Sequence, residues 1–393
     1  MLNVLTFSTL YPNAARPDWG VFVGRQTAEL ARSGLAAVQV VNPVGVPPAL
    51  LRALPAFARY RALASLPRVA ERDGVTVHHV PFPLLPGIGW RLNPAAIVHA
   101  CRPVLAGLRA TFAFDVIDAE FFFPCGVAAT RLGAAFGVPV SIKARGSDIH
   151  LWGRQPAARR MILEAGRHAG GLLAVSAALK RDMAALGLPE DRIAVHYTGV
   201  DLSRFQPIER PAARAALGLP EGPLLVSVGA LVPLKGHALT IDALARLSGV
   251  TLAIAGDGPE RATLQALAAR LGVADRVRLL GHVAHADIPK LLAAGDAMVL
   301  ASEREGLANA WVEALACGTP IVVTDVGGAR EVVDRPAAGR VLATRTPDAI
   351  ADAARALLAA PPPRAQTALA AQRFTWARNS AALAAHLARV AGL

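Results

Sequence analysis

A pair of α/β domains, each a doubly wound parallel sheet, is the fold class that the sequence predicts. Short apolar runs at residues 2–7, 224–228, 251–255 and 297–300 are each followed by a segment with helical patterning. This alternation of strand and helix is typical of βαβ units built on a parallel sheet. The chain has 393 residues, more than one hydrophobic core usually organises, so two domains fit the size better.

The domain boundary is predicted from composition. Residues 207–223 are rich in Pro, Gly and charged side chains, which is typical of a linker. We therefore expect an N-terminal domain over residues 1–205 and a second domain over residues 206–373. Hydrophobic residues make up 53% of the chain, enough for two cores, yet no apolar run approaches the roughly 18–20 residues that a membrane span needs.

Charge and cysteine content limit the partners. The net charge is +12, with most of the excess in residues 1–200, and a basic surface attracts nucleic acid, anionic lipid or a phosphorylated acceptor. The chain has no nucleic-acid-binding motif, so we expect no nucleic acid partner. An anionic membrane surface remains a possible partner, because each basic residue close to such a surface contributes about 1 kcal/mol of binding free energy. Cys101, Cys125 and Cys317 are widely spaced, which indicates a reducing compartment with neither disulfides nor zinc.

The N-terminal region opens with a βαβ pattern. Residues 2–7 read as a strand and not as a signal peptide, and a helix at 26–32 and a strand at 37–41 follow. Gly20 lies in the loop between strand 2–7 and helix 26–32. A glycine here allows a ligand to approach the backbone closely, although a simple turn would account for this glycine equally well.

Residues 43–95 form an irregular, Pro-rich region. A helix near residues 50–66 is predicted to place several arginines on one face, which is either solvated or docks on lipid headgroups or an acceptor phosphate. These arginines are Arg52, Arg59, Arg61 and Arg68. The apolar loop 84–90 either enters an interface or acceptor groove or packs on its own domain.

A polar segment follows the predicted strand 138–143. Arg145, Ser147, Asp148 and His150 would lie at the carboxyl edge of the sheet, where α/β enzymes place their chemistry. We expect an acceptor side here, with Asp148 and His150 positioning or deprotonating an acceptor hydroxyl. The structural alternative is that Asp148 caps the following helix.

The segment around residues 302–320 is the most informative one. It lies between the predicted strands 297–300 and 321–323, with Asn309 near a helix start and Gly318 just past its end. A helix N-terminus at the carboxyl edge of a parallel sheet favours phosphate. Glu305 and Glu313, about two turns apart, are either hydrogen-bond acceptors for sugar hydroxyls or solvated surface charges.

Other strand ends of the second domain carry weaker signals. Lys235, in the loop after strand 224–228, would place a cation over a diphosphate, although a lone loop lysine is more often solvated. The turn at Gly256-Asp257-Gly258 after strand 251–255 is compatible with any tight βα connection.

These residues resemble a known family over nearly the whole chain. The run E-G-L-A-N-A-W-V-E-A-L-A-C-G-T-P-I-V-V-T-D-V-G-G is similar to the E-x7-E signature of glycosyltransferase family 4, retaining nucleotide-sugar-dependent enzymes with the GT-B fold. The N-terminal pattern F-S-T-L-Y-P-N…G-V-F-V-x-R-Q-T-x-E-L resembles members of the teichuronic-acid type that build cell-surface polysaccharides.

The resemblance implies a fold and a donor site. It implies GT-B, two Rossmann-like domains facing an interdomain cleft, with a C-terminal helix over residues 374–393 crossing back to the N-terminal domain. It implies Lys235 on the donor phosphates, Glu313 on the donor ribose and Glu305 on the donor sugar. The other implied donor-binding residues contribute mainly backbone groups, and they are Gly20, Gly229, Ala230, Gly258, His282, Val283, Gly306, Leu307, Ala308, Asn309 and Ala310.

Two positions depart from the family pattern. Ala230 stands where the family usually has an arginine on the donor phosphates, and Arg145 stands where it often has a histidine. Loss of one of two phosphate cations weakens charge stabilisation by up to several kcal/mol. Another arginine, Arg145 or Arg25, would have to compensate, or the enzyme would be slow.

The chemistry follows from the leaving group. Breaking a nucleoside diphosphate sugar at its anomeric carbon releases a diphosphate, which a metal ion or fixed protein cations and amides must stabilise. The sequence has no Asp-x-Asp at a strand end and no metal-ligand spacing. We therefore predict metal-independent, hexosyltransferase-type transfer without a cofactor beyond the UDP- or GDP-sugar substrate, with catalytic roles for Asp148, His150, Lys235 and Glu305.

The expected acceptor is a lipid-linked, saccharide or small-molecule hydroxyl, and the expected location is cytoplasmic, with a peripheral site on the inner face of the cell membrane. Two alternatives remain. One is a catalytically silent GT-B subunit that binds a nucleotide sugar, supported by Ala230 and Arg145. The other is a nucleotide-sugar epimerase. The combination of Lys235, Glu305 and Glu313 favours the transferase.

Overall fold

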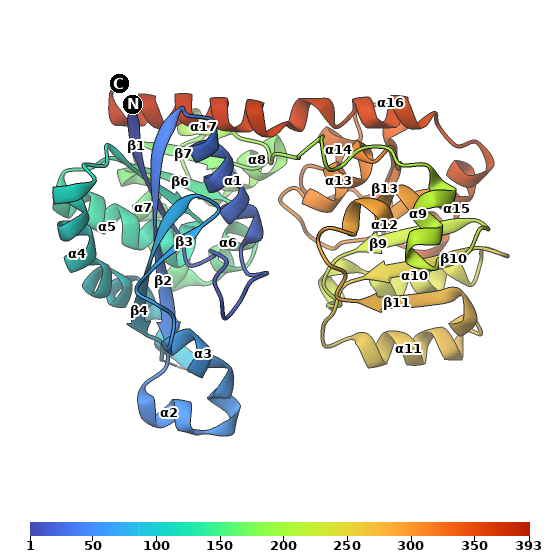
Figure 1. Cartoon of the computed structure of the whole chain (residues 1–393), viewed down its shortest axis with the longest axis horizontal. Coiled ribbons are helices and arrows are strands. Elements are labelled where there is room, and N and C mark those ends of the chain that lie inside the picture. The colour runs from blue at the N-terminus through green and yellow to red at the C-terminus, as the bar shows by residue number, and fades with distance from the viewer. Residues whose placement is uncertain (86) are drawn as a thin grey trace. The chain divides into compact units, whose positions relative to one another are not determined.

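The computed structural model describes residues 1–85 and 87–393 and divides them into two compact units. Unit 1 combines Met1–Tyr197 with Trp376–Leu393, and unit 2 is Thr198–Thr375 (Figure 1). The boundary lies a few residues before the expected 205/206 junction. The reason is visible within unit 2, where Val200 N–H donates to Phe374 O at 2.6 Å, so the first and last segments of this unit pair with each other.

Unit 1 contains an eight-stranded sheet in the order β3-β4-β2-β1-β5-β6-β7-β8. All neighbours are parallel except β3 and β4, which are antiparallel. The strands are β1 (Leu2–Phe7), β2 (Ala36–Val46), β3 (Val69–Arg72), β4 (Val75–Pro83), β5 (Val116–Glu120), β6 (Val140–Ala144), β7 (Gly171–Ala174) and β8 (Ile193–Val195).

Helices cover both faces of this sheet. They are α1 (Val21–Arg32), α2 (Ala49–Ala53), α3 (Arg61–Ala64), α4 (Asn93–Thr111), α5 (Val127–Phe136), α6 (Ser147–His150), α7 (Pro156–His168), α8 (Ala177–Leu186) and α17 (Trp376–Ala391). Short 3-10 turns lie at η1 (Pro55–Tyr60), η2 (Gly87–Leu92), η4 (Trp152–Arg154) and η5 (Glu190–Arg192), with one irregular turn at η3 (Phe122–Gly126).

The prediction of one helix over residues 50–66 is wrong. Leu54 is extended, as expected for a residue before proline, and Pro55 starts a separate 3-10 turn. The Arg61 guanidinium then donates to the carbonyl oxygens of Arg52 and Ala53 at 3.0 and 2.9 Å, at the end of α2. The single arginine face expected from the helical spacing therefore does not form. The adjoining apolar loop prediction includes Pro86, which lies outside the described residues.

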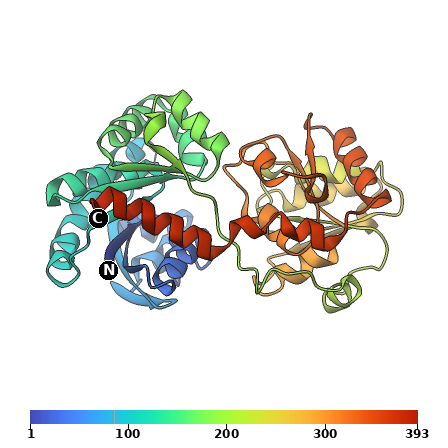
Figure 2. The ribbon, with the colours of Figure 1, turned by 90° about the horizontal axis from the view of Figure 1, so that it is seen from above.

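The C-terminal helix α17 is an integral part of unit 1, and Figure 2 shows it lying along this unit. Leu383 and Leu387 join a buried cluster with residues of β1, β5 and α1, including Val4, Val116 and Leu30. The helix therefore completes the core of a unit whose other residues end at Tyr197.

Unit 2 contains a fully parallel six-stranded sheet in the order β11-β10-β9-β12-β13-β14. The strands are β9 (Leu224–Val228), β10 (Thr251–Ala255), β11 (Val277–Gly281), β12 (Ala297–Leu300), β13 (Ile321–Thr324) and β14 (Gly339–Leu342).

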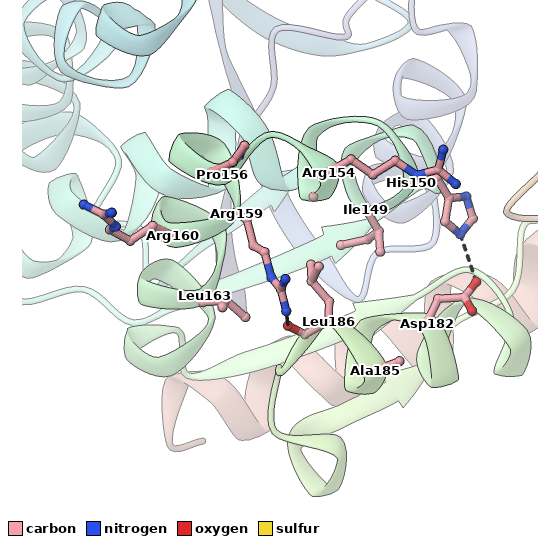
Figure 3. Close-up of a pocket in the computed structure, with 11 residues that line it drawn as sticks. Ile149, His150, Arg154, Pro156, Arg159, Arg160, Leu163, Asp182, Ala185 and Leu186 are labelled. Carbon is pink, nitrogen blue, oxygen red and sulfur yellow. Dashed lines mark hydrogen bonds and ion pairs between the residues drawn. The ribbon is translucent and has the colours of Figure 1, made fainter.

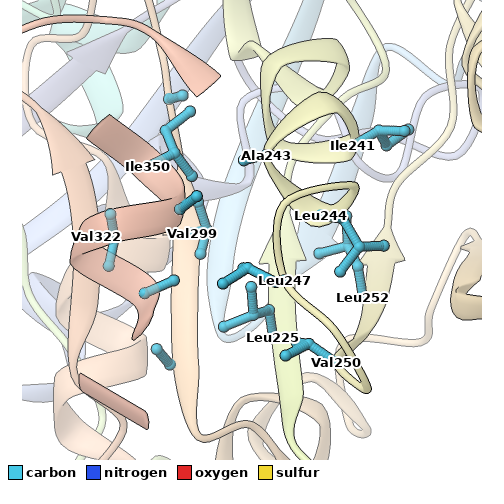
Figure 4. Packing of buried hydrophobic residues seen from close by; sticks show 14 of the residues in the cluster. Leu225, Ile241, Ala243, Leu244, Leu247, Val250, Leu252, Val299, Val322 and Ile350 are labelled. Atoms are coloured by element: carbon cyan, nitrogen blue, oxygen red, sulfur yellow. The ribbon is translucent and has the colours of Figure 1, made fainter. Parts of the chain in front are cut away.

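The helices of unit 2 flank this sheet. They are α9 (Arg210–Leu217), α10 (His237–Leu244), α11 (Arg261–Arg270), α12 (Ile288–Ala294), α13 (Asn309–Ala316), α14 (Ala329–Val332), α15 (Pro347–Ala359) and α16 (Arg364–Leu369), with 3-10 turns η6 (Pro233–Lys235), η7 (Ala274–Arg276), η8 (Pro336–Ala338) and η9 (Gln372–Phe374). Leu225, Leu252 and Val299 from the sheet pack against Leu244 and Ile350 from the helices (Figure 4).

Both sheets are doubly wound, as predicted. In each, the first strand of the unit pairs on one side with the second strand and on the other with a later one: β1 lies between β2 and β5, and β9 lies between β10 and β12. The strand order reverses at the β1/β5 and β9/β12 pairs, and the carboxyl ends at such switch points are where open α/β sheets bind ligands. Within the described residues, none of the helices combines the length and apolar composition that crossing a bilayer requires.

Candidate functional site

The switch point of unit 2 brings together two side chains that the sequence analysis selected. Lys235 lies in the connection after β9 and Glu305 in the connection after β12, and Lys235 Nζ donates to Glu305 Oε1 at 2.6 Å. Ser302 Oγ donates to the same carboxylate oxygen at 2.7 Å. Both charged side chains remain partly exposed, 22% for Lys235 and 12% for Glu305, so each can exchange its partner for a ligand.

A glycine allows the two connections to approach. Gly236, directly after Lys235, has φ +71° and caps α10. A Cβ at this position would lie 2.1 Å from the carbonyl oxygen of Ala301, the residue that follows β12. The glycine that follows Lys235 in the sequence is therefore required, because only a residue without Cβ lets the two connections approach closely enough to place Lys235 beside Glu305.

The connection that carries Glu305 is held on several sides. Arg345 Nε donates to Ala301 O at 2.8 Å, and the Thr324 hydroxyl donates to Ser302 O. Gly328 N–H donates to Gly306 O at 2.9 Å. These bonds fix the backbone on which the carboxylate stands.

Helix α13 starts immediately after this connection. Its cap residue Ala308 has no side chain that could accept from the first N–H groups. Trp311 N–H donates to Ala308 O at 3.1 Å, and the N–H groups of Asn309 and Ala310 before it are the ones suited to an anion. Leu307 and Ala308 are buried, and Glu313 is half-buried on the following turn of the helix. Asn309 Oδ1 accepts from Thr198 Oγ1 at 2.8 Å, a contact that the sequence analysis did not predict.

The other predicted donor residues of unit 2 divide into two groups. Gly229, Ala230 and Gly258 lie together, since Leu231 N–H donates to Asp257 O at 2.9 Å and a Cβ on Gly258 would lie 2.5 Å from Leu231 O. His282 and Val283 follow the edge strand β11. Among the described residues, no hydrogen bond or ion pair joins these two side chains to Lys235 or Glu305.

In unit 1, Asp148 is fully buried and already saturated with hydrogen bonds. Its carboxylate accepts from the backbone N–H groups of Phe122, Arg145 and Gly146 at 3.0, 3.1 and 2.9 Å. Burial raises the pKa of this carboxyl, and the three bonds oppose the rise. The structure does not match the capping alternative, because Asp148 is the second residue of α6 and Gly146 is the cap residue; its carboxylate instead joins the connections that follow β5 and β6. Its role in proton transfer stays a prediction.

Arg145 is bound by a buried carboxylate. Its guanidinium contacts Glu120 Oε2 at 2.6 Å and lies 5.0 Å from the ring centre of Phe22. The Glu120 side chain is fully buried, and that of Arg145 is 9% exposed. The charge of Arg145 is therefore matched inside its own unit.

The sequence analysis missed the network behind Arg145. Gln26 joins Glu120 to Lys143, and the Lys143 ammonium contacts His196 Nδ1. Burial lowers the pKa values of both Lys143 and His196. A charged residue inside a run otherwise typical of a buried strand, such as Lys143, is the sequence signal that could have revealed it.

His150 lies apart from this network. Its Nε2 pairs with Asp182 Oδ2 at 2.9 Å beside a cavity of about 710 Å³ between α6, α7 and α8 (Figure 3). Arg159, also at this cavity, donates to the Leu186 carbonyl at 3.0 Å. Ser147 is exposed at the start of α6. Gly20, with φ +70°, caps α1, and a Cβ there would lie 2.3 Å from the Leu10 backbone, so internal packing is sufficient to require glycine.

Metal binding was not predicted. In the part of the chain that the structure describes, no three His, Cys, Asp or Glu side chains gather as ligands, and metal-independent chemistry stays a prediction. The three cysteines are buried and free.

Two family models match the chain. One, described as Glycosyltransferase Family 4, matches residues 20–204, and one described as Glycosyl transferases group 1 matches residues 209–374. D-inositol 3-phosphate glycosyltransferase of Mycobacterium tuberculosis is 37% identical over 219 residues, 52% of this chain and 45% of that protein. The chain thus spans about half the length of the curated relatives it matches.

Solved structures share the fold over the full chain. Sucrose-phosphate synthase from Thermosynechococcus elongatus superposes with a TM-score of 0.79 at 18% identity, covering 98% of this chain and 97% of that one. Anabaena HepE in complex with UDP and glucose gives 0.75 at 21% identity, covering 99% and 100%. At these identities, the likeness shows the fold alone.

Proposed function

Since this chain belongs to glycosyltransferase family 4 and has the GT-B fold, we propose that it transfers a sugar from a UDP- or GDP-sugar to an acceptor hydroxyl with retained configuration. The proposed setting is assembly of a surface polysaccharide or glycolipid. The observation that carries the proposal is the Lys235–Glu305 pair at the β9/β12 switch point, next to the uncapped start of α13.

The pair is suited to a diphosphate leaving group. Glu305 pairs with Lys235 at 2.6 Å and neutralises its charge. A bound donor would replace this contact, with Lys235 donating to the phosphates and Glu305 accepting from sugar hydroxyls. The N–H groups from Gly306 to Ala310 would stabilise the charge that develops on the departing diphosphate. Glu313, half-buried on α13, would accept from the ribose.

We place no metal ion in this reaction, because lysine and helix amides supply positive potential where the leaving group develops its charge. Ala230 provides no second cation, and Arg145 is matched by Glu120 within unit 1. We therefore expect slow turnover relative to a site with two phosphate cations.

UDP-sugars are the first donors to test, because solved structures with this fold include Anabaena HepE with UDP-glucose. We place the reaction on the cytoplasmic side of the cell membrane. The excess of basic residues in the first half of the chain supports peripheral contact with anionic lipid at that surface.

A thermal shift panel tests donor binding. The full chain is melted with UDP, GDP, ADP and their glucose conjugates, in EDTA, and we expect one base to stabilise unit 2. At a hundred times the dissociation constant, the stabilisation is about 2.7 kcal/mol. Sugar release is then followed without acceptor. Slow metal-free hydrolysis of the stabilising donor supports the transferase, whereas no stabilisation by any nucleotide contradicts it.

A second candidate is a silent GT-B subunit, favoured by Ala230 and by the occupied Lys235–Glu305 pair. It predicts nucleotide-sugar binding without hydrolysis or transfer to any acceptor. An epimerase would instead return a changed nucleotide sugar with no loss of nucleotide, which chromatography of the products detects.

A further inference from the structure

Unit 1 has its own cavity at the switch point of its sheet. The cavity, of about 210 Å³, is lined by residues that follow or end four parallel strands: Thr9 after β1, residues 42–45 of β2, residues 82 and 84 around the end of β4, and Pro124 after β5. Neighbouring strands β1 and β5 are where the strand order reverses, so this is the position where an open α/β sheet binds a ligand. The sequence analysis named none of its lining residues as a binding residue, although Leu84 begins the apolar loop 84–90, for which an acceptor groove was one interpretation.

Arg16 is the charged residue of this cavity. Its guanidinium carbon lies 5.7 Å from the ring centre of Trp19 and 5.6 Å from that of Tyr60. The residue is half-buried, and among the described residues its guanidinium has no carboxylate partner and no hydrogen bond. A half-buried guanidinium between two rings keeps its planar set of N–H donors available for an oxyanion.

The segment that carries Arg16 is held in place before any ligand binds. Asn13 Oδ1 accepts from the N–H groups of Ala15 and Arg16 at 3.1 and 2.9 Å, and the backbones of Asn13 and Arg16 bond each other in both directions. Trp19 Nε1 donates to Thr9 O at 3.0 Å, which fixes the ring beside Arg16. Little conformational entropy is then left to lose on binding.

The remaining polar side chains of the cavity include amide donors. Because Asn13 Oδ1 is used twice, its Nδ2 amide is the part of the side chain without a partner in the described structure, and Asn93, at the start of α4, also lines the cavity with an unbonded side chain amide. Among the residues that the structure describes, no Asp or Glu lines the cavity. A cationic fork, amide donors and aromatic rings together fit an anionic oxygen group attached to a hydroxylated ring.

We propose that this cavity binds the phosphate or carboxylate group of the acceptor. The identification of the ligand as the acceptor rests on the proposed transferase function. The binding of an oxyanion by Arg16 is independent of that function. The volume is below the roughly 300–1,000 Å³ of pockets that enclose a whole drug-sized ligand, so the cavity holds one such group with part of the ring that bears it, and the rest of the acceptor extends outside.

The test compares anionic and neutral ligands on the purified full chain without donor. Binding of glucose 6-phosphate, glucuronic acid, inorganic phosphate and glucose is measured by calorimetry. We expect at least one of the two anionic sugars to bind about tenfold more tightly than glucose. Arg16→Gln should abolish this preference, and Arg16→Lys, which keeps the charge but not the fork, should retain only part of it.

Arg59→Gln is the matched control. Arg59 lies 5.1 Å from the ring centre of the same Tyr60 and donates to its hydroxyl at 3.4 Å, but it does not line the cavity. Its removal therefore deletes the same charge nearby without removing a guanidinium from the cavity wall. Its effect should stay within about twofold, as expected for a screened surface charge. Equal losses in the two variants would reduce the effect to the general field of the unit and overturn the proposal.

Further measurements distinguish a lipid headgroup from a soluble anion, and they test the anion site independently of the proposed transferase function. Vesicles of phosphatidylcholine with phosphatidic acid, compared with phosphatidylcholine alone, test a lipid headgroup, and binding lost in Arg16→Gln but not in Arg59→Gln assigns the anion to lipid. Two results overturn the proposal. One is equal affinity for glucose and its anionic analogues. The other is that Arg16→Gln changes the binding of neither the anionic sugars nor the vesicles. Arg16→Gln should leave the nucleotide-induced melting shift unchanged. If nucleotides do not bind but Arg16-dependent anion binding persists, the proposed function fails and the anion site stands.

Discussion

At the scale of single residues, the site in unit 2 depends on one ammonium and one carboxylate that neutralise each other at 2.6 Å. An ion pair that is still partly exposed costs little to separate. The same two groups can therefore hold the two connections in register and, under the proposed function, exchange this contact for the phosphates and the sugar hydroxyls of a donor.

Lys235→Ala should lower kcat/KM for sugar transfer or donor hydrolysis by about 10²–10³-fold, the size of effect expected when a group that stabilises transition-state charge is removed. Lys235→Arg should retain part of the activity. Steady-state kinetics with the stabilising donor measures both. Lys290→Ala is the control, because Lys290 pairs with Asp287 on the surface of the same unit. A change of less than threefold in Lys235→Ala would remove Lys235 from the reaction.

His237, at the start of α10, should make unit 2 less stable in acid. Burial lowers its pKa to about 4, so between pH 6.5 and 4 the unfolded chain takes up a proton that the folded unit excludes. The free energy of unfolding should therefore fall as the pH drops through this window, by about 3 kcal/mol at most. Denaturant unfolding of unit 2 at pH 7, 5.5 and 4.5 measures it, and His237→Gln should flatten the dependence.

The same measurement has an internal control in the other unit. Burial also lowers the pKa of His386 in α17 to about 4. His386→Gln should therefore flatten the pH dependence of the unit 1 transition and leave that of unit 2 unchanged. An unchanged pH slope in both single variants would show that other groups govern acid unfolding.

At the scale of elements, the site depends on how closely two connections can approach. The β9–α10 and β12–α13 connections belong to different βα units, and they meet only because β9 and β12 are neighbours in the sheet. The backbone of Gly236 then lies against the carbonyl of Ala301. This is a contact between segments more than sixty positions apart, and no local propensity reports it.

Gly236→Ala should destabilise unit 2 and weaken nucleotide binding, because its Cβ would lie 2.1 Å from Ala301 O. Gly249→Ala is a matched control in the same unit, with φ +70° and no atom within 4 Å of the added Cβ. The control should cost about 1 kcal/mol from backbone strain, and Gly236→Ala about 1–3 kcal/mol more. Urea unfolding and the nucleotide melting shift measure the difference, and equal costs would contradict the close-approach explanation.

At the scale of the whole molecule, unit 1 is built from two distant parts of the chain. Besides the Leu383 and Leu387 packing, Ser141 and His386 bond at 2.9 Å, and the Asn379 side chain donates to Tyr197 O at 2.6 Å. Unit 2 has its own buried cluster without α17. The last helix therefore contributes to the stability of the first residues of the chain.

A chain that ends at Thr375 lacks α17, so the free energy of unfolding of unit 1 should fall by several kcal/mol. Replacing a single buried leucine such as Leu383 or Leu387 by alanine already costs about 2–5 kcal/mol. The unit 2 transition should be unchanged, and so should the nucleotide-induced shift. Denaturant unfolding and limited proteolysis measure both units. A chain that ends at Ala391 is the control, because it removes only the last two residues, and Leu393 is 75% exposed. Equal stability of the two truncated chains would contradict the assignment of α17 to unit 1.

Much of the fold could be predicted because its signals are local. Apolar runs at 224–228, 251–255 and 297–300 form strands with those bounds, and Asn309 and Gly318 bracket α13 as expected. The predicted helix over residues 50–66 failed for an equally local reason, the conformation required by Leu54 before Pro55. The family motif favoured a donor role for Lys235 and Glu305, whereas spacing alone left a ligand role and a solvated surface charge both open.

The amino-acid sequence by itself determined the two doubly wound units, most element bounds and the choice of candidate residues in unit 2, because periodicity, glycine placement and a long motif are properties of consecutive residues. Only the tertiary structure decided which charges are already matched, as for Arg145 with Glu120 and Asp148 with three N–H groups. It also revealed Arg16 between Trp19 and Tyr60. Burial and partner choice depend on strand order, which brings distant segments together and which no single stretch of the chain encodes.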